Sequence, residues 1–214
     1  MIGCRPWRYT LIAVDLIVVF AGCDQVFGLH RGPSEAGVPE DVVTTVGVKI
    51  VFATRQPLSG AMGGLTGADA SCQSEATQAS LPGTFKAWLS DDRDSPSTRM
   101  TRHPGRYQLT STHVVAVSWD DLTDGTLAEA IHVTAAGGTT TSIAVCGGLH
   151  AGVWSSTSFD GTPTATGTCV NWTSNDSTSY ARTGDLLATD ANWSAVTNCM
   201  VACNTPMQIY CIEQ

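Results

Sequence analysis

Cysteine is the residue type whose number and spacing most directly predict chemistry in this chain. Six of the eight cysteines lie beyond Thr45: Cys72, Cys146, Cys169, Cys199, Cys203 and Cys211. An even number of cysteines behind an export signal is typical of disulfides. Zinc is the alternative, because Cys199 and Cys203 are spaced like half of a zinc site. No second close pair and no histidine after His150 supplies the other half, so we expect three disulfides and no metal.

Residues that could act in catalysis are present, but they form no known motif. The chain has no Gly-x-Ser-x-Gly nucleophile elbow, no His-Glu-x-x-His and no phosphate-binding Gly-Lys-Ser/Thr. The histidines beyond Thr45 are scattered, at His103, His113, His132 and His150. A lone histidine is more often a surface or core residue than a general base. We therefore expect no catalytic site, no cofactor and no enzyme activity.

Two clusters of aspartates occur in the chain, and the first of them could offer several oxygens to a cation. They are Asp91, Asp92 and Asp94, and Asp120, Asp121 and Asp124. The calcium loop with such spacing also needs a glycine and a distant glutamate, which the first cluster lacks. We expect the first cluster to be a solvated loop and the second to cap and solvate one helical turn.

Aromatic residues late in the chain are the remaining candidates for ligand contact. Trp154, Trp172, Tyr180 and Trp193 lie in or next to a stretch rich in Thr, Ser, Asn and Gly. Aromatic rings offer large contact areas to sugars and proteins. We expect Trp154 and Trp172 to fill the core. Tyr180 and Trp193 are the candidate ligand contacts.

The first residues have the order of an export signal. Arg5 and Arg8 precede an apolar run that ends at Cys23 and is short for a membrane span. Its last four residues, Phe-Ala-Gly-Cys, resemble a bacterial lipobox, and the alternatives are an ordinary signal peptide or an uncleaved anchor. We expect residues 1–22 to be a lipoprotein signal peptide, Cys23 to be acylated, and residues 23–45 to include a flexible tether.

An acylated Cys23 predicts a chain anchored to a membrane of the bacterial cell envelope. We favour the outer membrane or cell surface over the inner membrane. Removal of residues 1–22 takes away two arginines and one aspartate, so the formal charge moves from −8 to about −9. An acidic surface without a basic stripe excludes nucleic acid as a partner and disfavours heparin-like polyanions.

Hydrophobic patterning predicts one α+β domain over residues 46–214. A helix with Thr66 as its N-cap is predicted because Ala68, Cys72 and Ala76 recur at helical spacing, and Cys72 should face the core. One helical turn is predicted at 119–122, and residues 91–106 and 155–202 are predicted as loops, the second ordered by its disulfides. Strands are predicted at 48–54, 85–89, 107–109, 114–117, 131–133, 143–145, 153–154 and 207–212.

Several segments resemble the endostatin domain at the end of certain collagens. They are Gly60–Ser90, Ser118–Gly125, Val153–Trp154, Cys169-x-x-Trp172 and the run from Cys203 to Glu213. They are still more similar to bacterial exported lipoproteins that carry this domain without collagen. The resemblance covers residues 48–213. It implies a C-type-lectin-like α+β fold with a twisted antiparallel sheet, two helices and a long loop region pinned by disulfides.

The same resemblance implies which cysteines are bonded. It pairs Cys72 with Cys211 and Cys169 with Cys203. This leaves Cys146 for Cys199, with an exchange between Cys199 and Cys203 still open.

The chain departs from the resembling families where their ligands bind. The zinc site of endostatin uses an N-terminal histidine cluster, and this chain has only His30 there. Heparin binding uses surface arginines, whereas this domain is acidic. Sugar-binding lectins place a Glu/Gln-Pro-Asn/Asp tripeptide at calcium, and the nearest string here, Gln56-Pro57-Leu58, lacks the third oxygen ligand.

The sequence therefore predicts a membrane-tethered lipoprotein that displays one non-enzymatic, lectin-like domain for binding or adhesion. The ligand would be a glycan or a protein, and any specificity would lie in the loop beyond Trp154. We expect a monomer. The alternative is a structural envelope protein with no ligand of its own.

Overall fold

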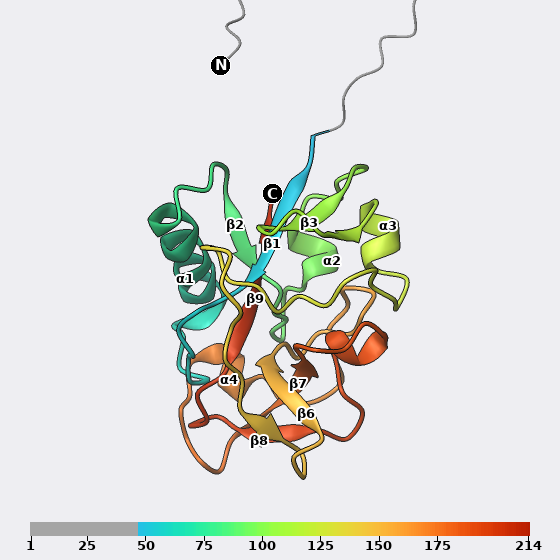
Figure 1. Ribbon diagram of the computed structural model, residues 1–214. Helices are drawn as coiled ribbons and strands as arrows, with labels where there is room; N and C mark the ends of the chain where they lie inside the picture. Colours follow the sequence, from blue (N-terminus) through green and yellow to red (C-terminus); the bar gives the residue numbers. More distant parts are fainter. Residues whose placement is uncertain (1–46) are drawn as a thin grey trace, which may run out of the picture. The chain divides into compact units, whose positions relative to one another are not determined.

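The computed structural model describes residues 47–214 (Figure 1). These residues form a mixed β-sheet whose central strand is β9 (Gln208–Glu213). The other strands are β1 (Lys49–Ala53), β2 (Phe85–Ala87), β3 (Tyr107–Leu109), β4 (Val114–Ala116), β5 (Ala144–Val145), β6 (His150–Trp154), β7 (Tyr180–Asp185) and β8 (Met200–Ala202). The helices are α1 (Gly64–Gln78), α2 (Pro96–Arg99), α3 (Trp119–Leu122), α4 (Cys169–Trp172) and the 3-10 helix η1 (Ala191–Trp193).

The predicted signal peptide, the acylated Cys23 and the tether lie outside these described residues. Within residues 47–214, no helix has the length and apolar character that crossing a membrane requires.

The strand order is β4-β3-β1-β9-β6-β7-β8, with β2 also paired to β9 and β5 to β6. Two of the pairings are parallel, β1 with β3 and β6 with β9. The sheet is therefore mixed, whereas the resemblance implies an antiparallel one. The physical reason is that parallel neighbours need long crossover connections, and the segments 54–106 and 155–207 provide them.

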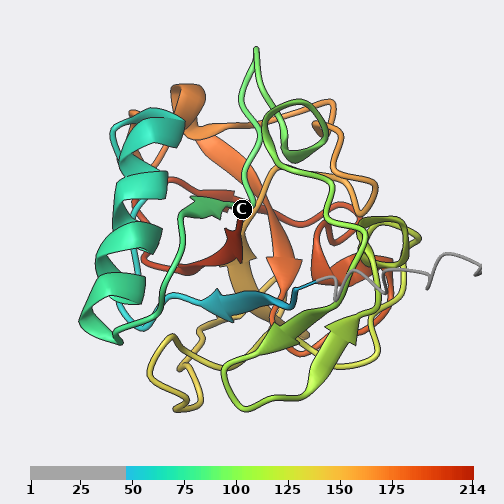
Figure 2. The same cartoon turned by 90° about the horizontal axis from the view of Figure 1, so that it is seen from above.

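Strand β9 is buried on both faces, so each face of the sheet carries part of the core. Ile209 and Cys211 belong to the cluster that also contains the buried residues of α1. Tyr210 and Ile212 alternate with them and belong to a second cluster, with Trp88. In Figure 2, α1 runs along one side of the sheet, away from β3 and β4.

Helix α1 shows the spacing that the sequence predicts. Ala68, Cys72 and Ala76 are fully buried, which confirms the predicted core face. The predicted start at Thr66 is wrong, because the helix begins at Gly64 and its N-cap is Gly63 with φ of 81°. Glycine adopts this left-handed conformation without a steric penalty, so the glycine turn enters the helix earlier than a side-chain cap would.

Three disulfides join distant parts of this fold. They connect Cys72 to Cys211, Cys146 to Cys199, and Cys169 to Cys203, with Cα–Cα distances of 5.4, 5.7 and 5.6 Å. These are the pairs to which the resemblance points.

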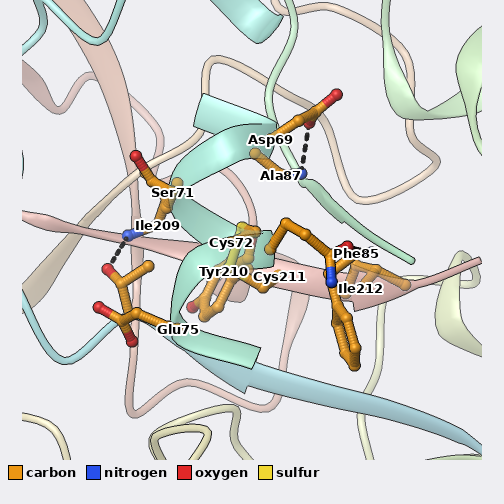
Figure 3. The surroundings of a disulfide bond; sticks show 12 residues. Asp69, Ser71, Cys72, Glu75, Phe85, Ala87, Ile209, Tyr210, Cys211 and Ile212 are labelled. Carbon is orange, nitrogen blue, oxygen red and sulfur yellow. Dashed lines mark hydrogen bonds between the residues drawn. A yellow bond between two sulfur atoms is a disulfide. The ribbon is translucent and has the colours of Figure 1, made fainter. Parts of the chain in front are cut away.

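The Cys72–Cys211 bridge ties α1 to β9 in the core (Figure 3). Asp69, one turn earlier on α1, accepts the backbone N–H of Ala87 at 2.8 Å and pairs with Arg99. The helix is therefore fixed to the sheet by a covalent bond and by a charged side chain.

The remaining predictions differ in outcome. Strand β3 and helical turn α3 lie at the predicted residues. A strand lies within each of the predicted ranges 48–54, 85–89, 114–117 and 143–145, whereas β6 begins three residues before the predicted 153–154 and β9 is shifted by one residue from the predicted 207–212. Residues 131–133 form only an isolated bridge, α2 lies inside the predicted loop 91–106, and strands β7 and β8 lie inside the predicted loop 155–202 because β6 pairs with β7 and β7 with β8. The described residues hold one helix of 15 residues and three of one turn, rather than two helices.

Turn α4 is left-handed. All four residues from Cys169 to Trp172 have φ between 50° and 62°, and Val170 and Asn171 have ψ of 56° and 41°. A left-handed conformation costs roughly 1–2 kcal/mol for an L-residue other than glycine or asparagine. The turn persists because its ends are held, by the bridge from Cys169 and by the indole N–H of Trp172, which donates to Ser90 O at 2.8 Å.

Val170 is the residue of this turn with most to gain from replacement, since it is β-branched and 62% exposed. We expect Val170→Asn to raise the free energy of unfolding by about 1 kcal/mol, because asparagine tolerates the left-handed region. Thermal unfolding with the disulfides intact measures this.

Val117→Asn is the matched control, since Val117 is 57% exposed but does not have positive φ. It should bring no gain. Equal shifts of the two melting temperatures would contradict the assignment of strain to α4.

Candidate functional site

A recess of about 440 Å³ lies between two loops and strand β7. The first loop contributes residues between 158 and 165, the second residues between 191 and 197, and β7 contributes Arg182. We call it the Arg182 pocket. All of its lining residues belong to the segment 155–202 that the sequence predicts as an ordered loop.

The first loop is anchored from outside by helix α2. The backbone N–H of Ser97 donates to Gly161 O at 2.9 Å, and Ser158 N–H donates to Thr162 O at 2.8 Å. Gly161 has φ of 80°, and a Cβ there would lie 3.1 Å from Ser97 N. Only glycine suits this close approach, so the loop has one defined position against α2.

The second loop is anchored by strand β9. The Tyr210 hydroxyl donates to Trp193 O at 3.0 Å, and Asp190 Oδ1 accepts the N–H of Asn192 at 3.0 Å. Burial raises the pKa of Tyr210 well above its ordinary value, and the nearby Asp185 charge raises it further. The phenol therefore stays protonated and keeps donating to the loop.

Buried hydroxyl groups join the two loops to each other. Ser194 Oγ donates to Thr157 O at 2.7 Å and accepts the indole N–H of Trp88 at 2.7 Å. Thr157 Oγ1 lies 2.8 Å from Ser90 Oγ. All four residues are fully buried, and such bonds are strong where water cannot compete. The walls of the pocket are thus fixed by the core.

Arg182 is the cation of this pocket. Its Nη1 donates to Val196 O at 2.9 Å, while its Nε is buried and has no hydrogen-bond partner within the described residues. It takes part in none of the ion pairs of residues 47–214. It is also the only lysine or arginine that follows Arg106 in the sequence.

The aromatic residues singled out by sequence have different fates. Trp154 and Trp172 are fully buried, which confirms them as core residues. Trp193 is also fully buried, so its prediction as a ligand contact is wrong. Its ring packs between Trp88 and Tyr210, at centroid distances of 5.0 and 5.6 Å.

Tyr180 is half exposed at the start of β7 and does not line the Arg182 pocket. It stays a predicted ligand contact.

The acidic clusters serve local backbone structure. Asp91 Oδ1 accepts the N–H groups of Arg93 and Asp94, both at 2.8 Å. Asp121 Oδ2 accepts the N–H of Val117 at 2.7 Å, beside the cap of α3. No group of three His, Cys, Asp or Glu side chains suited to a metal ion occurs within residues 47–214.

Two histidines within the described residues lie close to carboxylates, and His113 Nδ1 is 4.0 Å from Glu129 Oε2. His150 Nδ1 lies 2.9 Å from Asp185 Oδ2 and links β6 to β7.

The sequence patterns did not single out the side chains that line the Arg182 pocket. For Arg182, the signal that could have found it was its isolation as a lone cation among carboxylates.

Comparison with known protein families identifies the family of this chain. The family model described as "Collagenase NC10 and Endostatin" matches residues 49–214. A comparison with curated proteins finds no match.

The pocket walls offer a paired test of the hydroxyl network. Trp88→Phe and Trp193→Phe each remove part of a fully buried indole, but only the Trp88 N–H has a partner, Ser194 Oγ. We expect Trp88→Phe to lower the free energy of unfolding by about 1 kcal/mol more than Trp193→Phe, since it removes the buried hydrogen bond that the Ser194 hydroxyl accepts. Urea unfolding of the two variants measures the difference, and equal losses would argue against the network as the support of the pocket.

Proposed function

The chain belongs to the endostatin family, and from this premise we propose that residues 46–214 are a non-enzymatic binding domain of C-type-lectin-like fold, displayed at a bacterial cell envelope. The observation that carries the proposal is the Arg182 pocket. Its walls are held by α2, β9 and a buried hydroxyl network. A recess shaped by a rigid scaffold is the common form of a ligand site, and loops on such a scaffold commonly carry binding.

The disulfides support the lectin-like interpretation. Cys169–Cys203 and Cys146–Cys199 both have partners in the segment 155–202. Covalent closure of this kind holds a long segment of low intrinsic structure in one conformation. Apart from Arg182 in β7, the residues that line the pocket lie in the loops of this segment, outside strands β7 and β8.

The proposed anchor is an acyl chain on Cys23. The proposed tether of residues 23–45 would let the domain meet ligands as a monomer near the membrane. The outer membrane or the cell surface is the favoured location. The formal charge of −8 disfavours nucleic acid as the partner.

The binding function can be tested with residues 46–214 alone, because all three disulfides and both core clusters lie inside this range. We expect saturable binding of this domain to members of a glycan and matrix-protein array. The reduced and alkylated domain is the control and should not bind. An array with no signal above this control would sink the binding function and favour a structural role.

The anchor can be tested by metabolic labelling with a fatty-acid probe in a bacterial host. We expect label in the wild-type chain and none in Cys23→Ser, because the serine hydroxyl is not the thiol that is acylated. Cys4→Ser is the matched control and should keep its label. Equal labelling of wild type and Cys23→Ser would end the lipoprotein assignment.

A further inference from the structure

We infer that the Arg182 pocket recognises a sugar that carries a single carboxylate, such as a uronic acid, and that the guanidinium of Arg182 binds this carboxylate. The inference rests on the proposed binding function and adds the chemical class of the ligand. Three observations support it. Arg182 has no carboxylate partner within the described residues, several polar groups of the recess make no hydrogen bond there, and the other charged side chains of residues 107–214 are acidic.

The first step is the state of Arg182. Its Nη1 donates a hydrogen bond to Val196 O, whereas Nε and Nη2 have no hydrogen-bond partner within residues 47–214. Nε and Nη2 form one edge of the guanidinium, and two parallel N–H groups match the two oxygens of a carboxylate. Buried polar groups without a partner are rare in native proteins and call for an explanation. A carboxylate ligand at this edge supplies the missing acceptor.

The second step is the charge of the part of the chain that forms the pocket. Residues 107–214 hold nine aspartates and glutamates and one lysine or arginine, which is Arg182. A ligand with several negative charges would meet repulsion beyond the reach of this single cation. A carboxylate carries one charge, whereas a phosphate monoester carries about two. The balance of charge therefore favours a monoanion.

The third step is the rest of the lining. The hydroxyls of Ser158 and Thr197 and the side-chain oxygen of Asn192 line the recess and make no hydrogen bond within the described part of the chain. Such groups suit the hydroxyls of a sugar. The half-buried ring of Phe159 offers an apolar surface for the C–H face of a sugar ring.

The carboxylates of the two pocket loops, Asp160 and Asp190, do not pair with Arg182. Asp160 Oδ1 accepts the N–H and the hydroxyl of Thr162, and Asp190 accepts the N–H groups of Asn192. Both are used within their own loops. The guanidinium thus has no carboxylate partner within the described residues, and a recess of about 440 Å³ is within the range of small-molecule sites.

The test is titration of residues 46–214 with glucuronate, followed by calorimetry and by NMR of the Arg182 side-chain N–H groups. Glucose, which has the same ring without the carboxylate, is the matched ligand. We expect glucuronate to bind at least about tenfold more tightly than glucose, since hydrogen bonds to charged groups contribute more than neutral ones. We also expect the Arg182 Nε–H resonance to shift only with glucuronate.

Variants distinguish the loss of the Arg182 charge from a loss of folded structure. Arg182→Gln should weaken glucuronate binding about tenfold or more, and Arg93→Gln, at an exposed arginine outside the recess, should leave it unchanged. Since Arg182→Gln also removes the bond to Val196 O, Thr197→Val provides a second variant at an exposed position. It should weaken glucuronate binding while the melting temperature stays the same.

Each outcome decides between the two proposals. Equal binding of glucuronate and glucose, tighter binding of glucose 6-phosphate than of glucuronate, or full binding by a folded Arg182→Gln domain would overturn the ligand class. Hits on the array would then still support a binding domain. Failure of glucuronate together with an empty array would overturn both.

Discussion

Strand β9 is the constraint on which the rest of the fold depends. It pairs with β1, β2 and β6, and its residue Cys211 is bonded to Cys72 in α1. Its side chains alternate between the two core clusters, so neither cluster is complete without it. Because β9 is the last strand described and β1 the first, the pairing of these two strands joins residues that lie far apart in sequence. Closure of such long loops is costly in entropy, and a disulfide lowers that cost.

Strand β9 also holds one wall of the Arg182 pocket in place. Tyr210 of β9 holds Trp193 O, and Trp88, which follows β2, holds Ser194. The segment 155–202 is thus ordered by bonds to the sheet more than by regular structure of its own. This explains how a stretch rich in small polar residues forms a recess of fixed shape. The position of Arg182 inside β7, rather than at the tip of a loop, fixes the cation in the same way.

The sequence predicts the parts of this fold that depend on local pattern. Ala68, Cys72 and Ala76 have the spacing of one helix face, and Tyr107–Leu109 has the composition of a strand. Strand β7, with sequence YARTGD, has no such pattern. It is a strand because β6 and β8 pair with it, and strand propensity depends strongly on such context.

The pocket was beyond prediction for a related reason. A tryptophan in a polar segment can lie in the core or at the surface, and only packing against Trp88 and Tyr210 decides that Trp193 is buried. The isolation of Arg182 is visible in sequence, but whether a distant carboxylate reaches it depends on the tertiary fold. The family resemblance identifies the scaffold, whose match spans residues 49–214, and says nothing of this arginine.

An unpaired buried Nε lowers stability, so the fold must tolerate it. A buried polar group without a partner costs roughly 1–3 kcal/mol. Three disulfides that span 34, 53 and 139 residues each contribute about 3–5 kcal/mol in the chain-entropy model. The covalent framework therefore stabilises the domain by more than the unpaired group destabilises it. A scaffold of this kind can keep a cation unsatisfied until a ligand binds, and a smaller core without bridges would lose a much larger share of its stability.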